Sequence, residues 1–140
     1  MQSNWRRPRT FIASALVALG LVGVAPTGQG NVKAEQRKLS LFHTHTGKRL
    51  EVVYRRDGEY VPSALEEINR FLSDFRSGDI VEIDPALLDL IYDVRVFLGS
   101  EGTYQIISAY RSPKTNEMLR GRSANTGVAR KSQHLLGKAI

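Results

Sequence analysis

The spacing of apolar residues changes at Pro62, and this change constrains the fold more than any other feature of the sequence. Before Pro62, apolar and polar residues alternate, which is the pattern of half-buried strands. The alternating apolar residues are Leu39, Leu41, Leu50 and Val52. After Pro62, apolar residues recur at helical spacing: Leu65, Ile68, Leu72 and Phe75. Strands followed by helices predict an α+β fold, here a small antiparallel sheet with two to three helices.

The strand region is predicted to be a β-hairpin over residues 38–61, with its first turn at 43–48. Directly after it, Ser63 and Glu66 have the spacing of a capping box, in which each side chain bonds the other residue's backbone N–H. The first helix is therefore predicted to begin there and to run until Gly78.

Asp84 followed by Pro85 predicts the start of a second helix, because the Asp side chain accepts from free amides and Pro needs no donor at the first position. Gly99 is expected to end this helix. One apolar face is predicted on it, made of Leu87, Leu88, Ile91, Val94, Phe97 and Leu98.

A short buried strand is predicted over residues 104–108, since this stretch is rich in aromatic and β-branched residues. Ser112 is expected to cap a third helix that ends at Met118 or Leu119. Residues 121–131 are mainly Gly, Ser, Asn, Thr and Arg, which predicts a mobile surface loop.

The composition is that of a globular protein, and it argues against nucleic-acid binding. It has 140 residues, 41% hydrophobic and 24% charged, which suits one domain with an ordinary core. The net charge is +6, but four of the twenty Lys and Arg residues fall in the first 34 positions, which contain no acid. No dense basic stripe with interleaved aromatic residues occurs, so we expect no nucleic-acid binding.

The sequence contains no cysteine. Disulfides, thiolate zinc ligands and a cysteine nucleophile are therefore excluded, and any metal would have to be bound by His and carboxylate side chains.

Residues 1–34 have the three parts of a secretory signal: a basic start, an apolar run from Phe11 to Ala25, and small residues before a cut after Ala34. The apolar run is shorter than the roughly 20 residues that a membrane span needs. We expect export to the periplasm or cell envelope, with no stable span after cleavage. The pair Arg6 and Arg7 also resembles a twin-arginine signal, so both export routes stay open.

Two motifs carry a family resemblance. The segment from Ser108 to Pro113, Ser-Ala-Tyr-Arg-Ser-Pro, is followed by Asn116. Downstream, Ser132 and His134 begin Ser-Gln-His-Leu-Leu-Gly-Lys-Ala. In this order and spacing they resemble the murein endopeptidase K-like zinc peptidases, within the superfamily of D-alanyl-D-alanine carboxypeptidases and hedgehog-type metallopeptidases. The similarity covers roughly residues 37–140, so residues 35–140 are expected to form a peptidase domain of this type.

The resemblance implies a zinc-dependent hydrolase that cuts the peptide crosslinks of peptidoglycan, with stem peptides as its substrate. It implies that His134, expected on an extended segment, binds Zn²⁺ and that Arg111 acts in catalysis on a carbonyl oxygen or a substrate carboxylate. The remaining motif residues, Ser108, Tyr110, Asn116 and Ser132, are expected to bind substrate or to support the site.

Small residues at Gly137 and Ala139 would let the backbone pack closely beside such a site.

Other interpretations of the same residues stay open. His134 can be a surface or packing residue, Arg111 can hold a loop by pairing with Asp93 or Glu117, and Ser132 can be an ordinary loop serine. Carboxylates on the expected helices, Asp74 among them, are explained by solvation and helix-dipole effects.

His43 and His45 alternate on one face of the hairpin, where they can share a metal or simply face solvent beside the turn.

In the family the second motif continues with a metal-binding Asp, which would follow Ile140, and a His-x-Asp segment comes later. The sequence as given stops before both, so we expect it to be a fragment that is catalytically inactive. The alternative is a non-catalytic envelope protein that binds peptidoglycan or has a structural role.

Overall fold

A computed structural model of the chain describes residues 35–123 and 126–140. The expected signal peptide at residues 1–34 lies outside the described residues. Within the described ranges, no helix combines the length and apolar character needed to cross a bilayer.

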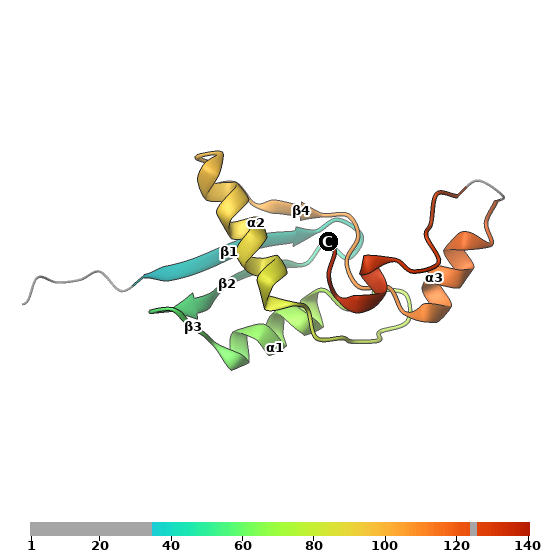
Figure 1. The fold of residues 1–140 in the computed structure, drawn as a ribbon, viewed down its shortest axis with the longest axis horizontal. Helices are drawn as coiled ribbons and strands as arrows, with labels where there is room; N and C mark the ends of the chain where they lie inside the picture. The colour runs from blue at the N-terminus through green and yellow to red at the C-terminus, as the bar shows by residue number, and fades with distance from the viewer. Residues whose placement is uncertain (1–34, 124–125) are drawn as a thin grey trace, which may run out of the picture. The chain divides into compact units, whose positions relative to one another are not determined.

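A four-stranded sheet with the order β3-β2-β1-β4 forms the centre of the fold (Figure 1). Strands β1 (Gln36–His43), β2 (Arg49–Arg56) and β3 (Glu59–Tyr60) are antiparallel neighbours, which confirms the predicted hairpin. Strand β4 (Tyr104–Ile106) pairs with β1 in parallel. The α+β class is confirmed, but the sheet is mixed, because the helices between β3 and β4 return the chain to the same end of the sheet.

The core lies between one face of the sheet and two helices. Alternate residues of β1 and β2 are buried, as their spacing predicted. These residues are Leu39, Leu41, Leu50, Val52 and Tyr54. Helix α1 (Pro62–Phe71) packs against β2 and helix α2 (Pro85–Phe97) against β1, and they add Ile68 and Leu88 to this cluster.

Helix α1 differs from its prediction at both ends. The residue before it is Val61, no side chain caps its amides, and Ser63 lies inside the helix, so the capping box is wrong. The helix ends at Phe71 and does not reach Gly78. The physical reason is tertiary: the carbonyl of Leu72 accepts from the N–H of Tyr110 at 3.2 Å, and the carboxylate of Asp74 accepts from Ser112, which is 38 residues away.

Helix α2 begins as predicted, with Asp84 Oδ1 accepting from the N–H of Ala86 at 2.9 Å. It is followed by Gly99 at φ +59°. The predicted apolar face is only partly buried: Leu88 is 0% exposed, but Phe97 is 89% exposed. The apolar face is present as predicted, but from Val94 onward its residues are exposed.

Helix α3 (Pro113–Arg120) also begins as predicted, with Ser112 Oγ accepting from the N–H of Thr115 at 3.3 Å. The second motif does not lie on an extended segment. It forms a short 3₁₀-helix, η1 (Gln133–Leu136), because Ser132 accepts from the N–H of His134 and Gly137 turns the chain at φ +65°.

Candidate active site

The two sequence motifs, far apart in the chain, are in direct contact. The backbone N–H of Arg111 donates to the carbonyl of His134 at 3.1 Å. In the opposite direction, His134 Nδ1 lies 2.8 Å from the carbonyl oxygen of Ala109. The loop between β4 and α3 and the helix η1 therefore hold each other in place and form the candidate active site.

The imidazole of His134 is oriented by a backbone carbonyl. A carbonyl oxygen can only accept, so Nδ1 carries the proton and Nε2 keeps the lone pair. Burial lowers the pKa of His134, and the positive charge of Arg111 lowers it further. Hydrogen bonding to the backbone of Ala109 and Ala139 acts in the opposite direction and raises the pKa. A neutral ring oriented by a backbone carbonyl is the usual state of a histidine ligand.

His134 fits one ligand position of a zinc site, and a zinc site needs more than one protein ligand. Within residues 35–123 and 126–140, no three His, Cys, Asp or Glu side chains lie close enough to hold a metal ion.

The guanidinium of Arg111 is oriented by Ser108. Arg111 Nε and Nη2 donate to Ser108 Oγ at 3.1 Å and 2.8 Å. Pairing with Asp93 or Glu117, which the sequence left open, does not occur: in the described ranges Arg111 has no carboxylate within 4.0 Å. Arg111 is half-buried, and burial lowers its pKa, as does the nearby charge of Arg76. Its remaining N–H groups can therefore bind an oxygen of a ligand.

Asp74 holds the Arg111 loop and was missed by sequence reasoning, which treated it as a solvated helix residue. It is 0% exposed, and its Oδ2 accepts from the N–H and Oγ of Ser112 at 3.0 Å and 2.9 Å. Burial alone would raise its pKa, but hydrogen bonds from Thr115, Ser112 and Arg76 lower the pKa to about 2. The contact with Ser112 could not be predicted from the sequence, because Ser112 lies 38 residues away.

The other motif residues support the two loops. Tyr110 donates its backbone N–H to the carbonyl of Leu72 at 3.2 Å and packs its ring beside the core. Ser132 Oγ accepts from the N–H of His134 at 3.3 Å. Asn116 Nδ2 donates to the carbonyl of Ala129 at 3.1 Å, which ties α3 to the segment before η1.

Gly137 has the close backbone packing that the sequence suggested. A Cβ atom at this position would collide with the carbonyl oxygen of Glu82 and lie 3.2 Å from Val81 Cγ1. The carbonyl of Gly137 accepts from the N–H of Asp84 at 3.0 Å. The segment after η1 is thereby fixed against the start of α2.

His43 and His45 lie outside the candidate active site. His43 is 1% exposed, not solvent-facing, and its Nδ1 accepts from the N–H of His45 at 3.3 Å. Its ring packs edge-on against Phe71 and Phe75, and the ring of His45 stacks on Phe75 at 4.6 Å between centroids. This arrangement is that of an aromatic cluster under the hairpin turn.

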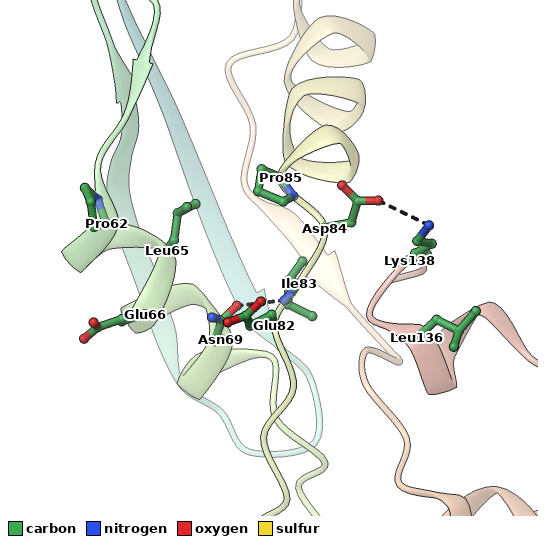
Figure 2. A pocket seen from close by; sticks show the side chains of 10 residues that line it. All are labelled: Pro62, Leu65, Glu66, Asn69, Glu82, Ile83, Asp84, Pro85, Leu136 and Lys138. Carbon is green, nitrogen blue, oxygen red and sulfur yellow. Dashed lines mark hydrogen bonds and ion pairs between the residues drawn. The ribbon is translucent and has the colours of Figure 1, made fainter.

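A cavity of about 460 Å³ lies between α1, the residues before α2 and the segment after η1 (Figure 2). Asn69 Oδ1 accepts from the N–H of Ile83 across it, and Lys138 pairs with Asp84 at 3.7 Å. Neither Arg111 nor His134 lines this cavity, so we separate it from the candidate active site.

Comparison with known proteins identifies the family. Residues 31–140 match the family described as peptidoglycan L,D-endopeptidase MepK. The chain belongs to this family. The resemblance drawn from the two motifs is thereby confirmed, and the motif residues that meet in the structure lie within the matched range.

Curated MepK proteins are similar along most of the chain. Peptidoglycan L,D-endopeptidase MepK of Escherichia coli (strain K12) is 37% identical over 134 residues, which covers 94% of this chain and 72% of that protein. The probable peptidoglycan L,D-endopeptidase MepK of Haemophilus influenzae is 28% identical over 134 residues, 94% of this chain and 71% of that protein. No solved structure matches the chain significantly.

Proposed function

We propose that this chain belongs to a zinc-dependent endopeptidase that hydrolyses peptide crosslinks of peptidoglycan. The observation that supports this proposal is the direct contact between the two motifs, in which the His134 imidazole bonds the carbonyl of Ala109 and the backbone of Arg111 bonds that of His134. Membership of the MepK family, whose curated relatives are named as peptidoglycan L,D-endopeptidases, gives the substrate class.

In this proposal His134 binds the metal through Nε2, while the carbonyl of Ala109 keeps the proton on Nδ1. Bound zinc would supply Lewis-acid polarisation and a water whose pKa is lowered to about 7. Arg111, held by Ser108, donates to the substrate carbonyl oxygen as that oxygen gains negative charge. Asp74 is a positioning residue, because it fixes the backbone directly after Arg111.

We further propose that residues 1–34 are a cleaved signal peptide and that residues 35–140 belong to a peptidase domain exported to the periplasm or cell envelope. The basic start and apolar run of the leader support export, and a peptidoglycan substrate requires it.

The proposal is tested with protein expressed from its complete reading frame and incubated with purified peptidoglycan sacculi and zinc. We expect released muropeptides, detected by liquid chromatography and mass spectrometry, and loss of release after metal chelation. His134→Gln and Arg111→Gln are each expected to lower the rate by about 100-fold or more. Bound zinc, measured by elemental analysis, should fall only in His134→Gln.

His45→Gln is the matched control, because it removes an imidazole outside the candidate active site and should leave hydrolysis unchanged. Full activity of His134→Gln would contradict the metal role. Binding of the wild-type protein to sacculi without any hydrolysis would instead favour the non-catalytic envelope protein.

A further inference from the structure

A second cavity, of about 270 Å³, opens between α3 and the segment that leads into η1. The charged residues of the cavity in Figure 2 are Glu66, Glu82, Asp84 and Lys138. The second cavity differs from it, because two arginines contribute to its wall. Its lining residues are Pro113, Asn116, Glu117, Arg120, Arg130 and Leu135.

The two arginines are available for a ligand. Within the described ranges neither Arg120 nor Arg130 has a carboxylate within 4.0 Å, whereas Arg37 and Arg55 pair with Asp89. Glu117 also lines the cavity, so its side chains carry a net charge of one positive unit. A guanidinium group can bind a carboxylate through two parallel hydrogen bonds. The arginines of this cavity can bind a carboxylate in that way.

Asn116 also lines the cavity, and its side chain has an acceptor without a partner among the described residues. The residue is 4% exposed and its Nδ2 donates to the carbonyl of Ala129, but among the described residues its Oδ1 has no hydrogen-bond partner. A buried polar atom without a partner costs free energy, so a donor at this position would be favourable. A peptide ligand offers such a donor in its backbone N–H groups.

The cavity adjoins the candidate active site along both loops. Leu135 follows His134 in η1, and Pro113 begins the helix that starts two residues after Arg111. The wall of the cavity is therefore built from residues that neighbour both parts of the candidate active site in the chain.

We propose that this cavity is a substrate subsite that binds a carboxylate of the stem peptide through Arg120 and Arg130, while Asn116 Oδ1 accepts from a peptide N–H. This inference rests on the proposed function and adds the part of the substrate that the protein recognises outside the reacting bond. The subsite favours acidic peptides and disfavours peptides whose carboxylates are amidated.

The test uses a peptidoglycan stem tetrapeptide and its counterpart in which every carboxyl group is a carboxamide. Binding of each is measured by isothermal titration calorimetry to the protein from its complete reading frame, with chelator present so that no cleavage occurs. We expect the acid to bind about 10-fold or more tightly than the carboxamide. Arg120→Gln and Arg130→Gln should each weaken binding of the acid several-fold, and the double variant should remove the preference.

Arg56→Gln is the matched control, because Arg56 is an exposed arginine at the far end of β2 and its loss should change neither affinity. Arg120→Lys keeps the positive charge and should retain part of the preference, which separates binding from a folding defect. Circular dichroism of each variant reports its fold.

The subsite is overturned if the wild-type protein does not bind the acid, or if the double variant keeps the full preference for it. Sacculus digestion tests the proposed function separately. Hydrolysis of sacculi without a preference for the acid would contradict the subsite but not the proposed function. A preference for the acid without hydrolysis of sacculi would contradict the endopeptidase function but not the subsite.

Discussion

Gly137 shows how one residue can fix the placement of a functional loop. Its φ of +65° lies in the left-handed region, and its Cα faces the carbonyl oxygen of Glu82 too closely for a side chain. Because η1 ends at this glycine, the position of His134 relative to α2 depends on it.

Gly137→Ala is therefore expected to lower the free energy of unfolding by about 2–4 kcal/mol, from the left-handed backbone and the collision together. Gly47→Ala is the control, since Gly47 has φ +70° but no atom within 4 Å of the added Cβ, and it should cost only about 1 kcal/mol. Urea denaturation of both variants measures the difference. Equal costs would show that the Gly137 contact is not tight.

His43 is a second residue whose environment has a measurable effect. Burial lowers its pKa, and the charges of His45 and Lys48 lower it further. Its Nε2 is buried without a partner among the described residues, so a proton added to the ring would not be compensated.

As pH falls through the ordinary histidine pKa of 6.5, the unfolded chain therefore binds a proton that folded His43 does not bind. The free energy of unfolding should decrease from pH 7.5 to 5.5, and His43→Gln should make this decrease smaller. Chemical denaturation at both pH values measures it, and an unchanged pH dependence in the variant would contradict the assignment.

The start of α3 is fixed by a residue of another element. Ser112 caps the helix with its own hydroxyl, and Asp74 accepts from both the N–H and the hydroxyl of Ser112. Residues 74–79 thus serve as a support for the loop that carries Arg111. As a consequence, α1 ends at Phe71, earlier than its apolar spacing would allow.

Asp74→Asn should lower the free energy of unfolding at pH 7 by about 2 kcal/mol, the value that a fall in pKa from 3.8 to about 2 represents. The folded-state pKa is depressed, so the wild-type protein should lose this stability as pH falls from about 4 to about 2, and the variant should not. Denaturation across this range tests both statements. Glu67→Gln, an exposed carboxylate on α1, should change stability by less than about 0.5 kcal/mol.

In the whole described domain, the sheet and α1 form a continuous core, while the second half of α2 extends beyond it (Figure 1). Val94, Val96 and Phe97 are exposed there. The same apolar pattern along one helix therefore stabilises the fold at one end only.

Leu88→Ala is expected to cost about 2–5 kcal/mol, because it leaves a cavity under the sheet. Phe97→Ala should change the free energy of unfolding by less than about 0.5 kcal/mol, since its ring is 89% exposed. Thermal and urea unfolding of the two variants compare them directly. A large loss in Phe97→Ala would indicate that this face is covered in solution.

Local signals in the sequence determined the hairpin, the starts of α2 and α3, and the two motifs, because alternation, Asp-Pro and Ser-Pro each act within a few residues. Asn116 was identified from its motif, but its unused acceptor beside two arginines was visible only in the fold.

The tertiary structure alone decided where α1 ends, that β4 runs parallel to β1, and that His134 sits on a 3₁₀-helix against Ala109. It also decided the role of Asp74. These features depend on hydrogen bonds between residues far apart in the chain. The free energy of such a bond depends on how deeply it is buried and on where its partner lies, and the neighbouring residues in the sequence determine neither.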